Sequence, residues 1–212
     1  IFQCMFAIIT PALVTGAFAE RMKFGALCLF IVLWVTIVYA PLAHWVWGGG
    51  WLGDLGALDF AGGTVVHISA GAGALAAALV IGRRIGFPEQ PMGPANVPMV
   101  ILGAALLWFG WFGFNAGSAG APDRLAVLAF VNTQVAAAAG GLSWILIEWI
   151  HRGRPTSVGL ITGAVAGLVG ITPACGYVDT SWALVIGWGA TTASFFAVNR
   201  IKKWFTYDDS LD

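Results

Sequence analysis

Residues 59–82 read DFAGGTVVHISAGAGALAAALVIG, and no Lys, Arg, Asp or Glu follows Asp59 within this stretch. A helix needs about 20 mostly apolar residues to cross a lipid bilayer. Residues 61–82 have that length and composition. We therefore predict a membrane helix that starts just after an acidic residue, Asp59, and carries an imidazole, His67, within it.

The composition of the whole chain agrees with a membrane protein. The chain has 212 residues, of which 59% are hydrophobic and 9% are charged, whereas soluble domains carry about 25% charged residues. Its net charge is zero, which disfavours a nucleic-acid partner because such partners require basic surfaces. The sequence contains no GxSxG motif, phosphate-binding loop or paired catalytic carboxylates, so we do not expect an enzyme.

Apolar segments between the polar and Gly- or Pro-rich junctions define the expected architecture. The alternation of an outer-membrane barrel is missing from the sequence, so we predict an all-α polytopic membrane helix bundle. The expected spans are residues 1–19, 24–43, 61–82, 98–119, 125–150, 157–175 and 181–199. The final residues, TYDDSLD, are interpreted as a polar loop, and both ends of the chain are interpreted as truncated.

Basic residues predict the orientation of these spans. Nine Lys and Arg side chains fall in alternate loops on one side, and Arg124 falls on the other side. The nine are Arg21, Lys23, Arg83, Arg84, Arg152, Arg154, Arg200, Lys202 and Lys203. Cytoplasmic loops carry the excess of basic residues, so we expect the nine to face the cytoplasm and residues 44–60 to be external.

Asp59 has the position of a helix N-cap. Its carboxylate can accept hydrogen bonds from the first backbone N–H groups of the following helix, expected to be those of Ala61 and Gly62. A structural cap is the favoured interpretation. A buried negative charge there would also favour cations in a nearby external vestibule, and the two roles are compatible.

His67 lies eight residues after Asp59, about 12 Å deeper along a helix. Polar side chains at that depth face a bundle interior or a cavity and are candidates for function. Gly63 and Gly71 flank His67 at four-residue spacing and allow a close backbone approach. We expect His67 to line a narrow path, and the alternative is a hydrogen-bonded structural histidine.

A second pattern is aromatic. Phe6 lies one helical turn after Phe2, the same spacing separates Phe114 from Ser118, and Trp47 begins the external WGGGW loop. Such residues are common in packing and in interfacial belts. Brought together, an indole, a phenyl ring and a hydroxyl would suit a small cation through cation–π attraction and a hydrogen bond.

The remaining polar residues have structural interpretations. Glu148 precedes Arg152 by four residues, a spacing that favours an ion pair or snorkelling to the surface. His44 and His151 are expected to be solvated in loops at span ends. The histidines lack zinc-binding spacing, so neither a metal nor a cofactor is expected. Three cysteines are interpreted as packing residues: Cys4, Cys28 and Cys175.

Several stretches are similar to one known family. They read GAFAERMKF, AHWVWGGG, DFAGGTVVH, GWFGFNAGSAG and AGLVGITPACGYV, and they closely resemble the ammonium transporter family, which includes methylammonium permeases and Rhesus proteins, particularly its bacterial members. The resemblance implies an eleven-span bundle of two inverted halves, assembled as a trimer. Residues 1–212 would then be a partial membrane domain that covers the third to the ninth spans.

The resemblance also implies site residues. Trp47, Phe6 and Ser118 resemble an external ammonium-recruiting site, and Phe6 and Phe114 resemble two stacked phenyl rings that close the pore. Asp59 matches the acid beneath the vestibule. His67 matches the first of two pore histidines, of which the second follows a motif like DDSLD and is expected beyond residue 212.

The implied function is ammonium uptake through the bacterial inner (plasma) membrane. Ammonium would be recruited externally and deprotonated, and ammonia would pass a hydrophobic pore lined by His67. Expected partners are the lipid bilayer, two sister subunits and a cytoplasmic PII-type regulator. Alternatives are an ammonium sensor of the same fold, a Rhesus-type neutral gas channel, disfavoured by Trp47 and Ser118, and a structural scaffold.

Overall fold

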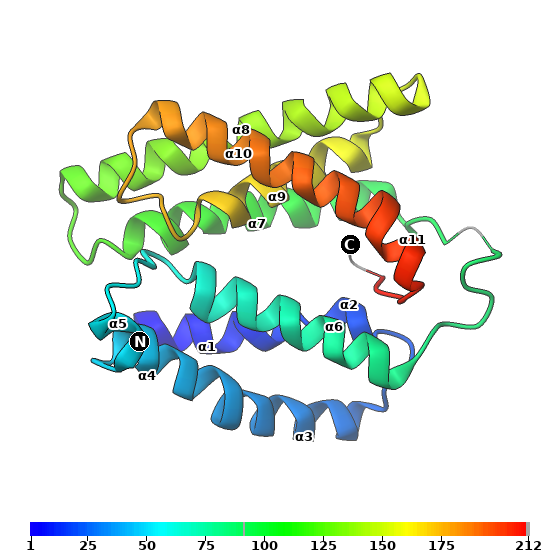
Figure 1. Cartoon of the computed structure of the whole chain (residues 1–212), viewed down its shortest axis with the longest axis horizontal. Coiled ribbons are helices and arrows are strands. Elements are labelled where there is room, and N and C mark those ends of the chain that lie inside the picture. The colour runs from blue at the N-terminus through cyan, green and yellow to red at the C-terminus, as the bar shows by residue number, and fades with distance from the viewer. Residues whose placement is uncertain (91, 211–212) are drawn as a thin grey trace. The chain divides into compact units, whose positions relative to one another are not determined.

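A computed structural model describes residues 1–90 and 92–210. Within these residues, the regular secondary structure consists of α-helices and short π-helices. The chain divides into two compact units, Ile1–Met92 with Lys202–Asp212, and Gly93–Ile201. Each unit is described separately, and Figure 1 labels the helices of both.

The first unit contains the helices on both sides of the WGGGW loop. They are α1 (Phe2–Ala12), α2 (Thr15–Phe18), α3 (Phe24–Trp34), η1 (Val35–Tyr39), α4 (Ala40–Trp47), α5 (Trp51–Asp54), η2 (Gly63–Ile68), α6 (Ser69–Ile81) and α11 (Lys202–Phe205). The π-helical stretch η1 joins α3 to α4 just before Pro41. Proline lacks an N–H and clashes with the preceding turn, and a π-helical stretch is one way to accommodate it within a continuing helix.

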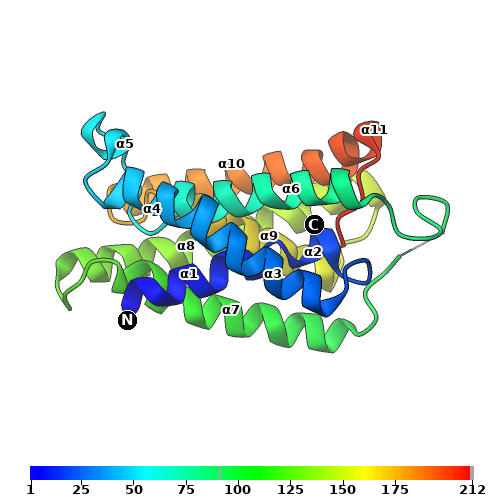
Figure 2. The ribbon, with the colours of Figure 1, turned by 90° about the horizontal axis from the view of Figure 1, so that it is seen from below.

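The core of the first unit lies between α2 and α6. Val14, Ala17 and Phe18 pack against small residues at four-residue spacing on α6, namely Ala70, Ala74 and Ala78. Small side chains at this spacing let two helices approach closely. Figure 2 shows α6 and α3 of this unit side by side.

The second unit is a four-helix arrangement in which α8 contacts each of the other three helices. Its helices are α7 (Val97–Gly117), α8 (Arg124–Arg152), α9 (Ser157–Ile171) and α10 (Thr180–Phe196), which continues as η3 (Ala197–Ile201). A Cβ on Gly140 of α8 would collide with the backbone oxygen of Gly163 in α9. These helices therefore pack backbone to backbone, which only glycine permits at this point.

The helix lengths fit a multi-pass membrane bundle. By length and apolar composition, five helices of the described residues could cross a membrane: Phe24–Asp54, Gly63–Ile81, Val97–Gly117, Arg124–Arg152 and Thr180–Phe205. The predicted spans 1–19 and 157–175 correspond to shorter apolar helices, Phe2–Phe18 and Ser157–Ile171. The second of these ends before Pro173, a residue that cannot continue the backbone hydrogen bonding of a helix.

Candidate functional site

Asp59 binds the start of a helix, as predicted, and of its two expected donors Gly62 is confirmed and Ala61 is not. Its Oδ1 accepts hydrogen bonds from Gly62 N at 2.8 Å and Gly63 N at 2.6 Å. Its Oδ2 accepts from Thr64 N at 2.8 Å and Val65 N at 3.1 Å. The expected donor Ala61 was wrong because the helix begins at Gly63, two residues later than predicted. The carboxylate is buried and satisfies all the leading N–H groups of this helix.

The later helix start also changes the position of His67. Residues before Gly63 form a turn, with Gly62 in the left-handed region at φ 105°. His67 is therefore four residues into η2, about 6 Å along the helix axis from its start. The predicted depth of about 12 Å below Asp59 counted the four residues before Gly63 as helical, and the depth itself stays a prediction. The Nε2 atom of His67 is buried, and its backbone N donates to Gly62 O at 3.0 Å.

The turn before η2 is held by Trp47, the last residue of α4. The indole Nε1 of Trp47 donates to the backbone oxygen of Asp59 at 2.8 Å. A Cβ on Gly62 would lie 2.7 Å from Val66 Cγ2 and 3.3 Å from Trp47 Cη2. Both its φ and its crowded surroundings therefore require glycine at this position.

Phe6 meets Trp47 in the same unit. Their ring centroids are 5.8 Å apart at an interplanar angle of 84°, and Phe2 lies 5.0 Å from Phe6. Edge-to-face packing of this kind is favourable for aromatic pairs. The indole N–H of Trp47 is a hydrogen-bond donor and cannot bind a cation, so Trp47 would attract a cation with a ring face.

The other predicted site residues lie in the second unit. Ser118 is the C-cap of α7, and its Oγ donates to the backbone oxygen of Phe114 at 2.8 Å. Phe114 packs against Trp111 with ring centroids 5.8 Å apart. The Ser118 hydroxyl oxygen can still accept a hydrogen bond from a ligand. That Ser118 completes a site with Trp47 and Phe6, and that Phe114 stacks on Phe6, stay predictions.

Sequence reasoning missed a buried polar pair one turn from Trp111. Asn115 is fully buried, and its amide nitrogen donates to Thr133 Oγ1 of α8 at 2.9 Å. Trp111 itself donates from Nε1 to Thr172 Oγ1 at 2.9 Å. The sequence did contain a signal for this pair: an asparagine, which is rare inside an apolar 21-residue helix, four residues after Trp111.

Glu148 and Arg152 form the predicted ion pair at 3.2 Å. Glu148 is nevertheless 2% exposed, and its Oε2 also accepts from Thr156 N at 2.9 Å, so it is a buried structural group rather than a snorkelling one. His44 and His151 are exposed, as expected, but they lie inside α4 and α8 because both helices run past the predicted ends. 

The predicted packing role of the cysteines applies to one of them. Cys175 is buried, whereas Cys4 and Cys28 are exposed on the described surface. Within residues 1–90 and 92–210, no group of three or more His, Cys, Asp or Glu residues could hold a metal ion.

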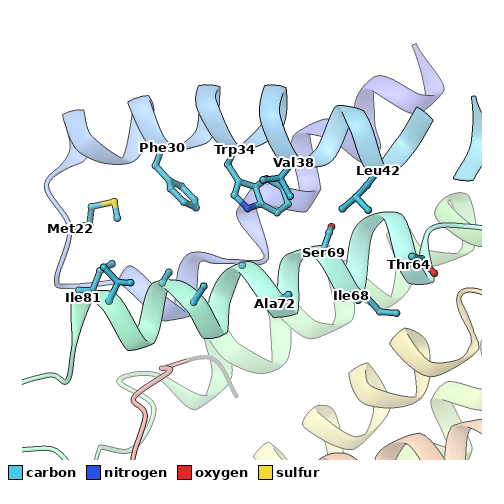
Figure 3. A pocket seen from close by; sticks show the side chains of 14 residues that line it. Met22, Phe30, Trp34, Val38, Leu42, Thr64, Ile68, Ser69, Ala72 and Ile81 are labelled. Atoms are coloured by element: carbon cyan, nitrogen blue, oxygen red, sulfur yellow. The ribbon is translucent and has the colours of Figure 1, made fainter. Parts of the chain in front are cut away.

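A groove of about 610 Å³ runs between α3 and α6 in the first unit. In Figure 3, Trp34 at the end of α3 and Val38 in η1 point toward Ser69 and Ala72 of α6. The full lining is Met22, Phe30, Trp34, Val38, Leu42, Thr64, Ile68, Ser69, Ala72, Gly73, Ala76, Ala77, Val80 and Ile81. This surface is mainly aliphatic and aromatic, so it suits hydrocarbon better than a small cation.

The segment expected to be a polar loop contains a third buried acid, Asp208. The carboxylate of Asp208 is fully buried and is bound by the Arg84 side chain, with Arg84 Nη2 2.8 Å from Asp208 Oδ1. The hydrogen bonds from Arg84 hold the pKa of Asp208 below its usual value. Adjacent acids in a short polar stretch gave no sign that one of them would be buried.

A family model and the curated relatives of this chain agree on one family. The model of the Ammonium Transporter Family matches residues 1–212. The ammonium transporter of Bacillus subtilis is 54% identical over 211 residues, which cover 100% of this chain and 52% of that protein. Ammonium transporter Amt1 of Archaeoglobus fulgidus is 54% identical over 212 residues, 100% of this chain and 54% of that protein. The chain spans about half the length of the curated relatives it matches.

Solved structures of related proteins have the same fold as this chain. The crystal structure of Candida albicans Mep2 matches 99% of this chain and 47% of that chain, with a TM-score of 0.93 and 45% identity. The structure of a sensor Amt protein matches 99% of this chain and 55% of that chain, with a TM-score of 0.94 and 38% identity. 

Proposed function

Because the chain belongs to the ammonium transporter family, we propose that the protein containing it carries ammonium across a membrane. The match of the family model to residues 1–212 is the observation that carries this proposal. Residues 1–212 would form the third to the ninth spans of an eleven-span transporter with inverted halves. The length of the relatives, about twice that of this chain, supports such an assignment.

Ammonium would first bind on the external side, at Trp47, Phe6 and Ser118. The ring of Trp47 has its N–H occupied by Asp59 and packs edge to face on Phe6. A cation over an aromatic face is attracted by the quadrupole of the ring. Ser118 would add a hydrogen-bond acceptor, since its own proton is donated to Phe114.

Asp59 would act on the cation through its charge and through the backbone that it holds. Its carboxylate is bound by four backbone N–H groups, and its backbone oxygen receives the Trp47 indole. Backbone N–H donors and a carboxylate form charge-assisted hydrogen bonds, which are among the stronger ones. Asp59 would therefore favour a cation nearby and fix Trp47 at the same time.

Beyond the external site, the substrate would pass as neutral ammonia. An unpaired cation in an apolar passage is costly, so ammonium would lose its proton near the gate formed by Phe6 and Phe114. His67, one turn into η2, would provide a polar contact for the ammonia. The protein would work as a trimer in the bacterial inner membrane, with a PII-type regulator on its cytoplasmic face.

A sensor is the second candidate function, and the similarity to a sensor Amt protein supports it. A sensor would bind ammonium with the same residues but would transmit a signal rather than a flux. A Rhesus-type gas channel is less favoured, because the sequence carries the Trp47 and Ser118 pattern.

Uptake of labelled methylammonium by cells that express the full-length protein tests the proposal. We expect uptake by the wild type, a higher KM in Trp47→Leu, and altered transport rate or selectivity in His67→Ala. Trp51→Leu is the matched control, because Trp51 is exposed on α5 near the same loop. Ammonium binding without uptake would favour the sensor, and unchanged transport in His67→Ala would contradict the role of His67.

A further inference from the structure

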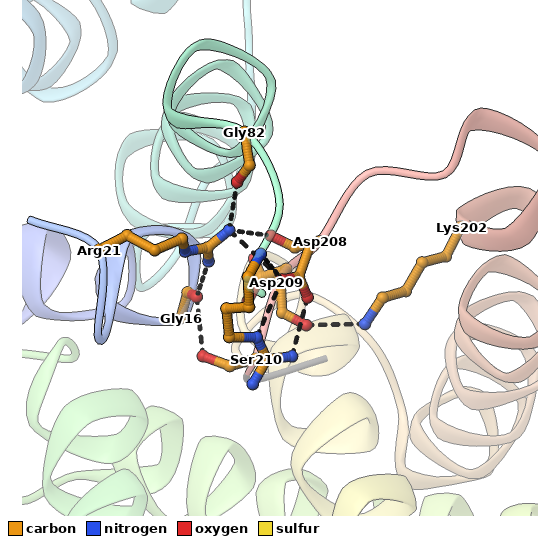
Figure 4. A network of polar contacts seen from close by, with 8 residues as sticks. Gly16, Arg21, Gly82, Lys202, Asp208, Asp209 and Ser210 are labelled. Carbon is orange, nitrogen blue, oxygen red and sulfur yellow. Dashed lines mark hydrogen bonds and ion pairs between the residues drawn. The ribbon is translucent and has the colours of Figure 1, made fainter. Parts of the chain in front are cut away.

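Asp208 is the centre of a buried polar cluster drawn in Figure 4. Its Oδ2 accepts from the backbone N of Arg84 at 2.8 Å and from Arg84 Nε at 2.9 Å, and its Oδ1 accepts from Arg84 Nη2 at 2.8 Å. Arg21 Nη1 lies 3.6 Å from the same carboxylate. One aspartate therefore receives a paired contact from one guanidinium and lies beside a second.

Arg21 links three segments of the first unit. Its Nη1 donates to Gly82 O at 2.7 Å and to Asp208 O at 2.9 Å, and its Nη2 donates to Gly16 O at 3.0 Å. Ser210 adds a link, since its N and Oγ both donate to Gly16 O, at 3.1 and 2.8 Å. The cluster thus joins α2, the end of α6 and the segment after α11.

The helices joined by this cluster carry two of the proposed transport residues. Arg84 comes three residues after α6, and α6 continues without a break from η2, which carries His67. Arg21 comes shortly after α2, which follows α1 and Phe6. At the other end of the same unit, the contacts of Trp47 with Phe6 and Asp59 join α1, α4 and the start of η2.

We propose that Asp208 is a positioning residue for transport, which fixes α6 and therefore His67 relative to α1 and α2. This inference rests on the proposed function, because it gives His67 and Phe6 roles in that function. Asp208 does not touch the substrate. It acts through Arg84 and Arg21, whose side chains are 17% and 8% exposed and would lose their counter-charge without it.

The test uses the full-length protein with Asp208→Asn. Asparagine keeps the shape of the side chain but removes the charge, so the two arginines repel each other and the end of α6 shifts from α2. We expect the maximal methylammonium uptake rate per molecule in the membrane to fall about tenfold, since misplacement of a reacting group has effects of this order or larger. KM should change little, because the proposed recruiting residues Trp47, Phe6 and Ser118 all lie outside the cluster.

Glu20→Gln is the matched control. Glu20 precedes Arg21 in the sequence, is exposed, and has the same charge to lose. A second variant, Arg84→Gln with Asp208→Asn, removes both charges and restores the local balance. We expect it to return the amount of protein in the membrane to the wild-type value while the uptake rate per molecule stays low.

The outcomes separate this inference from the proposed function. A wild-type uptake rate per molecule in Asp208→Asn, or in the double variant, would overturn the positioning role while uptake by the wild type would still support a transporter. A loss of membrane protein in Asp208→Asn together with full recovery of uptake in the double variant would also overturn it, because Asp208 would then serve folding alone. Absence of uptake by the wild type itself would overturn the proposed function, and the positioning role with it.

Discussion

Neutralising Asp59 gives the sharpest test of the architecture around the candidate site. In Asp59→Asn, one oxygen remains to accept from Gly62 N and Gly63 N, whereas the new NH₂ group faces the N–H groups of Thr64 and Val65. Two backbone donors, Thr64 N partly buried and Val65 N buried, then lose their acceptor. Each such loss costs about 1–3 kcal/mol, so we expect the variant to be destabilised by about 2–6 kcal/mol.

The assay is thermal unfolding of the purified protein in detergent. For a protein of this size, 1 kcal/mol corresponds to a change in Tm of about 2–4 °C, so the lower limit of the estimate predicts a fall of about 4 °C or more. Asp54→Asn is the control, because Asp54 is exposed in α5. A Tm of Asp59→Asn equal to that of the wild type would refute the reasoning, because the two lost backbone hydrogen bonds would then contribute nothing.

The other predictions concern backbone approach and protonation. Gly62→Ala should lower Tm, since φ is 105° and the new Cβ meets Val66, whereas Gly25→Ala, where a Cβ meets open space, should leave Tm within a few degrees. Gly140→Ala should lower Tm in the same assay because its Cβ collides with Gly163 O, while Gly189→Ala in α10 should keep or raise it. The pKa of Asp208 is lowered in the folded protein, so its stabilisation is present above the usual aspartate pKa and is lost as pH falls through the lowered value. Acid unfolding curves should therefore lose part of their pH dependence in Asp208→Asn, and an unchanged curve would contradict this.

The sequence was sufficient to predict the helical membrane class because that signal is additive over many residues. Long apolar stretches between basic loops require helices, since only helices or closed barrels satisfy backbone hydrogen bonds in lipid. The ion pair of Glu148 and Arg152 was also predictable, because it depends on four-residue spacing within one helix. The family resemblance was carried by continuous motifs such as DFAGGTVVH and was confirmed over the whole chain.

The start of η2 could not be predicted from the same information. Residues 61 and 62 are small and apolar and would fit a helix, but the Asp59 carboxylate, the positive φ of Gly62 and the Trp47 indole together hold them in a turn. Each of these contacts depends on a residue that another element brings into place. The expected depth of His67 counted these residues as helical and stays a prediction, whereas its position on the helix that follows Asp59 was correct.

Buried carboxylates were the other feature that the sequence concealed, and they share one physical cause. Asp59, Glu148 and Asp208 are all buried, and each accepts a hydrogen bond from at least one backbone N–H at or near a helix end. A helix that crosses lipid must end in an interface where leading N–H groups and basic side chains still need partners. An acid at such a junction is stabilised more by hydrogen bonds from these donors than by water. Whether it is buried therefore depends on contacts that form only in the folded chain. In a chain with so few charged residues, acids next to span ends are therefore better candidates for structural junctions than for solvated loops.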